Sequence, residues 1–179
     1  AERQKYETIV KTAGWGMVIA DPDTHVMAFV NPAFERMHGY APGEMAGLSL
    51  ADTFAPESRA ELPAHVLAVH QKGYHTYESM HLRQDGSTFP CQTDVTAFKD
   101  SDGRVLFRAA TFEDITERKR SEQALQDSER RLRELIDGLG PSLFVGLTTL
   151  DGVILEANRP ALEAAHLTLA DVLGKRVEE

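Results

Sequence analysis

The stretch VMAFVNPAFERMHGYAPGEMAG, residues 26–47, recurs in altered form as VILEANRPALEAAHLTLADVLG at residues 153–174. The two stretches have equal length and a similar order of apolar and polar residues, and each begins with Val, ends with Gly and has Asn at its sixth position. Asn is a favoured N-cap, and the proline that follows in both copies is tolerated in the first turn of a helix. Each copy therefore predicts a short strand followed by a short helix, and the repeat indicates two related units.

The repeat also sets the expected domain boundaries. The second copy stands 127 positions after the first (26 to 153), and little chain follows it, so the second unit is expected to contain only its opening third. We expect four segments: an N-terminal helix at 1–13, a complete domain at 14–115, a connector helix at 116–140, and the N-terminal part of a truncated second domain at 141–179.

Around the first copy, the order of elements predicts an α+β fold. Residues 2–13 carry an apolar helical stripe, and two short apolar runs around Asp21-Pro22-Asp23 predict a hairpin. Residues 57–73 predict a helix that ends at Gly73. Three long strand-like runs separated by the turn sequences QDGS and DSDG complete the order: residues 74–83, 87–99 and 104–113. We expect an antiparallel sheet with helices on one face.

Composition excludes several classes of function. The formal net charge of −9 disfavours a nucleic-acid-binding surface, because phosphate contacts need clustered Lys and Arg. The single cysteine, Cys91, allows no internal disulfide and favours a reducing, cytoplasmic location. No apolar run reaches the roughly 18 residues that a membrane span requires. No catalytic motif and no metal-ligand spacing is present, so we expect a regulatory segment rather than an enzyme.

Three motifs together resemble a PAS domain with its C-terminal PAC segment: FVNPAFERMHGYAPGEMAG at 29–47, RQDGSTFP at 83–90 and FEDITERKRSEQAL at 112–125. The resemblance covers residues 14 to about 120, and the portion from Leu143 onward resembles the start of a second PAS domain. It implies a five-stranded antiparallel sheet with helices on one face. It also implies sensing of ligands, light, oxygen or redox state, or dimerisation, within a larger signalling protein.

Strand alternation and the helices before the three long strands predict which residues line the core or a modest ligand cavity. We expect one face of the second long strand to turn inward with Cys91, Thr93 and Val95, and one face of the third with Phe107 and Ala109. The full set of candidates is Phe34, Met37, Val66, His70, Met80, Leu82, Cys91, Thr93, Val95, Phe107 and Ala109. A filled core without a ligand is the competing interpretation.

The resemblance leaves the cofactor open between haem, flavin, a small organic ligand and nothing at all. Some PAS domains hold haem through a histidine on the helix before the three long strands, where His65 and His70 lie. An axial histidine needs an apolar pocket, and HVLAVH supplies apolar neighbours. Flavin photoreceptors of this family carry a reactive cysteine on a short helix, whereas the corresponding stretch ADTFAPESR contains none. Non-covalent flavin, bordered by Trp15, remains open.

A heptad pattern predicts a coiled coil in the connector. Leucines recur every seven residues, with two further apolar residues between the later ones, and the seam consists of Leu125, Leu132, Leu135, Ile136 and Leu139. A lone helix of this length is marginal in water, so we expect a parallel homodimer. A single helix packed on its own domain is the alternative.

Between the last strand and the connector, Asp114, Ile115 and Thr116 form the junction that should relay a signal. Asp114 is a candidate N-cap with Glu117 three residues later, and Thr116 is the competing cap. The sequence thus predicts a sensory and signal-relay segment of a multidomain protein, such as a histidine kinase or a cyclic-dinucleotide enzyme, which passes a change in the core to the downstream output domain. The alternative is a ligand-free scaffold for homodimerisation.

Overall fold

The computed structural model describes residues 2–140 and 142–177, so the outermost residues of the predicted segments 1–13 and 141–179 lie outside the described residues. The chain forms two compact units, residues 1–119 and 120–179. The elements of the first unit are α1 (Glu2–Thr12), β1 (Gly16–Ala20), β2 (Met27–Val30), α2 (Pro32–Met37), η1 (Leu50–Thr53), α3 (Pro56–Arg59), α4 (Leu62–Lys72), β3 (Tyr74–Leu82), β4 (Thr88–Lys99) and β5 (Val105–Asp114). The helix α5 (Thr116–Gly138) follows directly.

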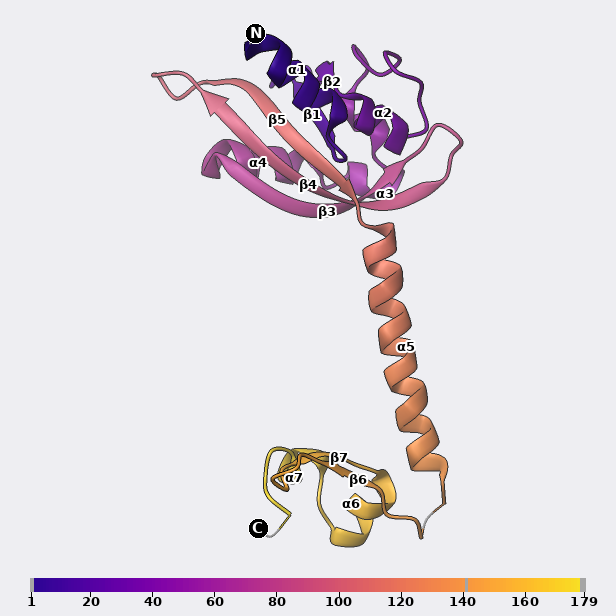
Figure 1. Ribbon diagram of the computed structural model, residues 1–179. Helices are drawn as coiled ribbons and strands as arrows, with labels where there is room; N and C mark the ends of the chain where they lie inside the picture. Colours follow the sequence, from indigo (N-terminus) through magenta and orange to yellow (C-terminus); the bar gives the residue numbers. More distant parts are fainter. Residues whose placement is uncertain (1, 141, 178–179) are drawn as a thin grey trace. The chain divides into compact units, whose positions relative to one another are not determined.

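Five strands form one antiparallel sheet in the order β2-β1-β5-β4-β3, with β5, the last of the five along the chain, at its centre (Figure 1). The three long strands begin and end within one residue of the predicted runs. The predicted five-stranded α+β fold is therefore confirmed. β5 is the central strand, and only one residue separates its end from the start of α5. A movement of β5 would therefore act directly on the first turn of the connector helix.

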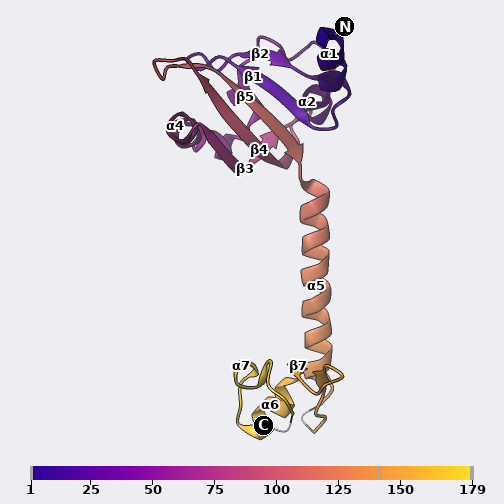
Figure 2. The same ribbon diagram turned by 60° about the vertical axis from the view of Figure 1, so that its left-hand side comes forward.

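Capping residues set where two of the helices begin or end. Asn31 accepts a hydrogen bond from the backbone N–H of Phe34 at 3.0 Å and begins α2. Pro63 lies in the first turn of α4, and Gly73 ends that helix with a φ of 81°, which a side chain would disfavour. In Figure 2, α4 lies next to β3 and α2 lies next to β1. The helical segments thus cover one face of the sheet.

The core of the first unit lies between that face and the helices. Phe34, Met27 and Phe112 are among its fully buried side chains. At Gly16 an added Cβ would stand 2.9 Å from the ring of Phe34, so only glycine allows α2 to pack this closely on β1. The predicted inward face of β4 is confirmed, since Cys91, Thr93 and Val95 are buried, as are Phe89 and Ala97 on the same face.

The predicted inward face of β5 is wrong. Directly opposite residues of antiparallel strands project to the same side of a sheet. Val95 pairs with Ala110 and Thr93 pairs with Phe112. The inner face of β5 therefore carries Arg108, Ala110 and Phe112, which are buried, whereas Phe107 and Ala109 lie on the outer face.

The predicted face of β3 is wrong for the same reason. His81 pairs with Phe89 and Tyr77 pairs with Thr93, so these two side chains turn toward the core. Met80 and Leu82 lie on the outer face. Alternation along a strand predicts which residues share a face, but only the register with β4 decides which face is inward.

The second unit contains most of α5, followed by β6 (Gly146–Thr148), β7 (Ile154–Ala157), α6 (Arg159–Ala165) and α7 (Leu169–Val172). Backbone hydrogen bonds repeat with the sequence. In each copy a strand residue exchanges two bonds with the closing glycine and its successor: Met27 with Gly47 and Leu48, and Ile154 with Gly174 and Lys175. The sequence repeat thus corresponds to a repeat in structure.

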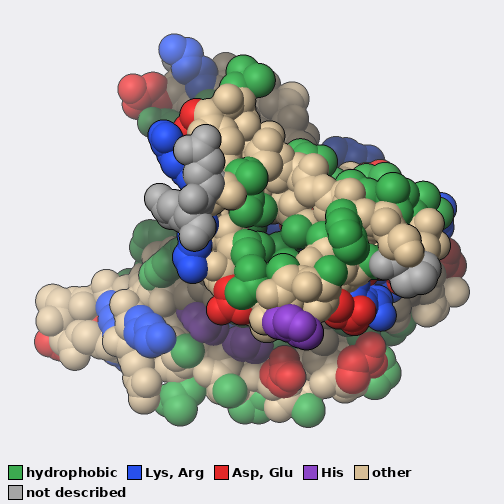
Figure 3. Space-filling view, turned by 90° about the horizontal axis from the view of Figure 1, so that it is seen from below, with side chains coloured by type: hydrophobic (Ala, Val, Ile, Leu, Met, Phe, Trp, Pro, Cys, Tyr) green, Lys and Arg blue, Asp and Glu red, His purple; other side chains and the backbone are tan. Residues whose placement is uncertain are grey.

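Large hydrophobic side chains also reach the surface of the molecule, where Figure 3 shows them in green. Several belong to the second unit, for example Phe144 and Leu147. Across residues 2–140 and 142–177, none of the helices has both the length and the apolar character needed to cross a bilayer.

Candidate ligand cavity and strand-to-helix junction

A cavity of about 510 Å³ lies between the inner face of the sheet and the segment that contains η1 and α4. Its walls are mainly apolar: Val18, Ala20, Leu50, Ala51, Leu62, Pro63, Val66, Leu67, Val69, Val95, Ala110 and Phe112. Small-molecule sites have volumes of roughly 300–1,000 Å³ and linings of this kind. The cavity is thus large enough for a small organic molecule.

Arg108 is a buried cation in the wall of this cavity, with 5% of its surface exposed. On β5 it stands between Ala20 of β1 and Ala97 of β4, whose small side chains leave room for it. Its Nη2 donates to the carbonyl oxygen of Asp21 at 3.1 Å and to Nδ1 of His25. Because Nδ1 of His25 accepts, the proton of that neutral ring is on Nε2. Burial, and then the charge of Arg108, lower the pKa of His25.

Several polar atoms at the cavity have no hydrogen-bond partner in the protein. Six buried side-chain nitrogen and oxygen atoms lack a partner among the described residues, and four of them belong to residues of the cavity wall. These four are His65 Nε2, His70 Nε2, Thr93 Oγ1 and Arg108 Nε. Buried polar groups in proteins are nearly always hydrogen-bonded. The cavity is therefore the place where the fold leaves donors and acceptors for another molecule.

His65 is held by aromatic and polar neighbours. Its Nδ1 lies 3.0 Å from Nε2 of His75, and its ring stacks on Tyr77 with 3.7 Å between the ring centroids. Burial, followed by the nearby His75, lowers the pKa of His65. Burial also raises the pKa of Tyr77 to about 12, so the phenol keeps its proton. His65 and Tyr77 thus form an uncharged part of the cavity wall near neutral pH.

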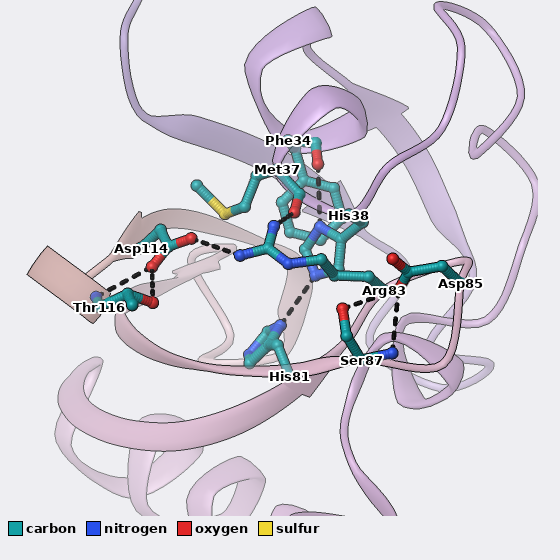
Figure 4. Close-up of polar contacts among 9 residues, drawn as sticks. All are labelled: Phe34, Met37, His38, His81, Arg83, Asp85, Ser87, Asp114 and Thr116. Atoms are coloured by element: carbon teal, nitrogen blue, oxygen red, sulfur yellow. Dashed lines mark hydrogen bonds and ion pairs between the residues drawn. The ribbon is translucent and has the colours of Figure 1, made fainter.

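A second histidine pair lies in the core beside α2 (Figure 4). His38 Nδ1 lies 2.8 Å from the carbonyl oxygen of Phe34, which can only accept, so Nδ1 carries the proton. His38 Nε2 is then an acceptor for Nδ1–H of His81 at 3.0 Å. This leaves Nε2 of His81 unprotonated and without a partner. Burial lowers the pKa of His38 to about 4 and that of His81 well below its usual value.

The strand-to-helix junction is held by an ion pair. Arg83, at the end of β3, donates to a carboxylate oxygen of Asp114 at 2.7 Å and to the carbonyl oxygen of Met37 (Figure 4). Its guanidinium group also lies 3.9 Å from the centre of the Phe89 ring. The other oxygen of Asp114 accepts from the backbone N–H of Thr116 at 2.9 Å and from its hydroxyl. One carboxylate thus joins β3, the end of β5 and the first turn of α5.

These contacts fix the charge of Asp114. Burial would raise its pKa, but hydrogen bonds from Thr116 and Arg83 outweigh that and lower it. The carboxylate is therefore ionised near neutral pH. The hydrogen bond to the N–H of Thr116 satisfies one of the free donors at the start of α5.

Glu78 forms a second attachment between the sheet and α5. Its carboxylate lies 2.9 Å from Arg118 and 2.6 Å from Lys119, both in the first turn of the helix. Arg118 also donates to the side chain of Gln92 on β4. The first turn of α5 is thus bonded to β3, β4 and the end of β5.

The structure separates the predicted pocket residues into three groups. Val66, His70, Thr93 and Val95 line the cavity. Another three belong to the adjoining core: Phe34, Met37 and Cys91. The remaining four lie on the outer face of the sheet: Met80, Leu82, Phe107 and Ala109. The last group cannot contact a molecule in the cavity.

The cofactor candidates differ in how they fit. His65 and His70 both line the cavity, and Nε2 of each ring has no hydrogen-bond partner, while Nδ1 of His65 bonds His75. Either ring could thus supply an axial bond to haem through Nε2. Cys91 does not line the cavity, and burial raises the pKa of its thiol to about 12, which disfavours adduct chemistry. Trp15 does not line the cavity either and is 52% exposed.

The predicted coiled-coil seam is exposed along α5. Its four leucines are between 57% and 63% exposed, and Ile136 is half-buried: Leu125, Leu132, Leu135, Leu139 and Ile136. The helix has no buried residue. The apolar stripe of α5 is therefore exposed and available to pack against another protein surface.

The sequence had not singled out several polar residues of the site. Arg108 and Tyr77 were missed because charged and amphipathic residues are usually assigned to the outer face. His38 and His81 give no sequence signal as a pair, because they stand 43 positions apart on different elements. Arg83 could have been found, since it begins the RQDG turn that carries part of the family resemblance.

The family comparison matches the first unit. The family model described as PAS domain matches residues 15–117. Over 141 residues, 76% of this chain and 21% of the relative, the chain is 28% identical to the bacterioopsin transcriptional activator of Halobacterium salinarum. It is 24% identical over 134 residues to the sensor histidine kinase TmoS of Ectopseudomonas mendocina, covering 74% of this chain and 14% of that protein. The chain spans at most about a fifth of these two relatives.

Solved structures show the same fold. A PAS domain from Colwellia psychrerythraea superposes with a TM-score of 0.60 at 16% identity, covering 65% of this chain and 99% of that one. A sensory box histidine kinase/response regulator from Burkholderia thailandensis gives a TM-score of 0.58 at 25% identity, covering 73% of this chain and 98% of the other.

Proposed function

This chain belongs to the PAS domain family, and we propose that it is a sensory and signal-relay segment that binds a small ligand in the cavity beneath α4. The observation that carries this proposal is the group of four polar atoms without a hydrogen-bond partner in the wall of one apolar cavity; one of them, His65 Nε2, also lies 3.9 Å from a carboxylate oxygen of Glu61. A filled core would bury few such atoms, and they would be scattered. Related chains include a sensor histidine kinase and a transcriptional activator, which supports a regulatory role in a multidomain protein.

The relay runs through the central strand. Arg108, Ala110 and Phe112 of β5 line the cavity, and the same strand ends at Asp114, next to α5. Only Ile115, which is 2% exposed, lies between strand and helix. A ligand that favours one of two arrangements of β5 would therefore shift the first turn of α5. The contacts of Asp114 and Glu78 with that turn hold it to the sheet, so a movement of the strand should be passed to the helix.

The output is carried by a homodimer. The exposed seam on α5 repeats with heptad spacing, as a parallel coiled coil with a second copy of this chain requires. Residues from Leu143 onward repeat the hydrogen bonds of the first unit, which supports their assignment as the start of a second PAS domain. We place the segment in the cytoplasm, upstream of an output domain of the same protein.

Cysteine cross-linking tests the dimer. Leu132→Cys lies in the seam, whereas Arg130→Cys, its matched control, lies roughly 160° away around the helix. Under mild oxidation we expect rapid disulfide dimers from Leu132→Cys and slow ones from Arg130→Cys. Native Cys91 does not interfere, because it is buried. Equal rates for the two variants would contradict the seam.

The ligand is tested in two steps. A visible absorption spectrum of the purified chain reports haem or flavin directly. A thermal-shift screen of small organic molecules then finds other ligands, and each hit is added to the Leu132→Cys cross-linking assay. We expect at least one hit to change the cross-linking rate. A blank spectrum and an empty screen would overturn the sensory proposal and leave the ligand-free dimer scaffold, which the exposed seam favours independently.

A further inference from the structure

Arg108 gives the cavity a positive charge that forms no ion pair among the described residues. Resting on the ligand site proposed above, we propose that the cavity selects an organic monocarboxylate with an apolar body, whose carboxylate binds Arg108. The inference depends on the charge balance around Arg108, the arrangement of polar and apolar wall residues, and the hydrogen bonds that Arg108 already makes.

The charge balance favours an anion. A guanidinium group keeps its charge near neutral pH, and buried charges in proteins are normally paired. Among the residues that the structure describes, no carboxylate forms an ion pair with Arg108. The charges of Asp21 and Asp23 act on Arg108 without a direct ion pair, and Asp21 contributes only its backbone carbonyl as a hydrogen-bond partner. Its carboxylate instead accepts hydrogen bonds from Asp23 and Thr24 at 2.7 to 3.0 Å.

Arg108 retains a donor for a ligand. Both of its hydrogen bonds to the protein leave from Nη2, which bonds Asp21 and His25. Its Nε is buried and has no partner. An N–H group of an arginine binds carboxylate oxygens strongly, because the bond is charge-assisted.

The wall has one polar and one apolar region. His70 and His25 both lie close enough to Arg108 for its charge to lower their pKa values, after burial as the main cause. The Nε2 atom of His70 is a further polar atom without a partner. The remaining wall is mostly apolar, including Val66, Val69 and Phe112. This arrangement suits a ligand with one anionic end and a hydrocarbon or aromatic body. A purely apolar ligand would leave the charge of Arg108 unpaired.

Isosteric probe pairs test the inference on the full chain. The probes are hexanoate, octanoate, decanoate and phenylacetate, each compared with its primary amide by isothermal titration calorimetry. We expect at least one carboxylate to bind about 10- to 100-fold more tightly than its amide, the range for a hydrogen bond to a charged group. Arg108→Gln should remove this preference by weakening the carboxylate and leaving the amide unchanged. Arg104→Gln, an exposed arginine on the approach to the same strand, is the control and should change neither.

Each other outcome decides against the inference. Equal binding of acid and amide would overturn carboxylate selection while leaving the sensory proposal intact. Binding of inorganic phosphate in place of the carboxylates, abolished by Arg108→Gln, would assign a different anion. No binding of any probe would overturn the inference, and the separate small-molecule screen would then decide the sensory proposal. A Soret band in the purified protein would show bound haem and would overturn the assignment of a monocarboxylate.

A folding defect in Arg108→Gln would not remove the test. The comparison of acid with amide is made on the unmodified chain. Arg108→Lys keeps the charge, so it should keep a preference for the acid. Loss of that preference in a folded Arg108→Lys variant, judged by circular dichroism, would count against a role for the charge.

Discussion

Nε2 of His38 lies 3.0 Å from Nδ1 of His81 inside the core, and both rings are fully buried. The carbonyl of Phe34 fixes the proton of His38 on Nδ1, so the pair has a single arrangement of protons. The unprotonated Nε2 of His81 lies in aromatic surroundings, with the rings of Phe54 and Phe112 4.2 and 5.6 Å away between centroids. A proton added to this pair would place an uncompensated charge in the core.

The first prediction is that acid destabilises the first unit through this pair. The folded pKa values lie below the unfolded value of 6.5, to about 4 for His38. Their stabilising contribution is therefore complete above pH 6.5 and is lost as the pH falls toward 4, because the unfolded state binds protons first. For His38 alone the loss is on the order of 3 kcal/mol by pH 4. Urea unfolding between pH 7.5 and 5 measures the part of this loss that occurs above pH 5.

A double substitution isolates the pair from the other histidines, which titrate in the same direction. His38→Phe/His81→Phe replaces both partners by apolar rings, so stability at pH 7.5 should change little. Its loss of stability between pH 7.5 and 5 should be smaller than that of the unmodified chain. His166→Asn, at an exposed histidine, should keep the original dependence. Parallel pH curves for the double variant and the original would contradict the assignment.

The second prediction concerns the ion pair of Arg83 with Asp114. Asp114→Ala removes both the ion pair and the acceptor for Thr116, and should cost about 1 kcal/mol or more of stability. In a double-mutant cycle with Arg83→Met and Asp114→Asn, we expect a coupling of about 1 kcal/mol, since the pair is partly exposed. Urea midpoints give the cycle. Additive single effects would show that the two residues act separately.

The sequence predicted the five strands and the helix ends at Asn31 and Gly73, but it did not predict the division of the expected helix at 57–73 into α3 and α4 or the direction in which two strands face. The helix ends at Asn31 and Gly73 follow from local capping chemistry, and the strand lengths follow from turn residues. In β5 the residues alternate as Val105-Phe107-Ala109 and as Leu106-Arg108-Ala110, and hydrophobicity favours the first set. The register with β4 turns Arg108 and Ala110 of the second set inward, but a bulge between Phe98 and Lys99 interrupts the alternation near the turn, where Leu106 is exposed and Val105 packs against the core.

The candidate site was found only in part for a related reason. Val66, His70, Thr93 and Val95 were predicted because they lie on elements whose inward face is clear. Arg108 was missed because a charged residue in a strand is expected at the surface. Its burial depends on the small neighbours Ala20 and Ala97, which belong to other strands. Such long-range neighbours are not visible in one strand's sequence.

The third prediction concerns the attachment of α5 to the sheet. Glu78→Gln removes the charge that holds Arg118 and Lys119, so the first turn of α5 should open more often. Hydrogen exchange of backbone amides in residues 116–122 should become faster, while exchange in β4 stays unchanged. Glu57→Gln, at an exposed glutamate in α3, is the control. Unchanged exchange at the helix start would show that Asp114 alone is sufficient there.

The fourth prediction follows from the two repeated asparagines. Asn31 accepts from the backbone N–H groups of Met17 and Phe34 and donates to the carbonyls of Val10 and Trp15. Asn158 bonds in the same way: it accepts from Val145 and Ala161 and donates to Ile136 and Leu143. Asn→Asp keeps the acceptor oxygen and replaces the donor by a second, charged acceptor that faces two carbonyl oxygens.

Hydrogen exchange measured by mass spectrometry reports the outcome for each unit. Asn31→Asp should cost roughly 3 kcal/mol, since it leaves a buried charge against carbonyl oxygens, and should speed exchange in peptides from β1 and α2. Asn158→Asp should speed exchange in peptides from β6 and α6. Asn→Ser variants, which lose the donors without adding a charge, should lie between these and the unmodified chain. If Asn158→Asp left residues 145–165 as protected from exchange as before, the second asparagine would not stabilise its unit. The functional part of the structural repeat would then be limited to the backbone hydrogen bonds.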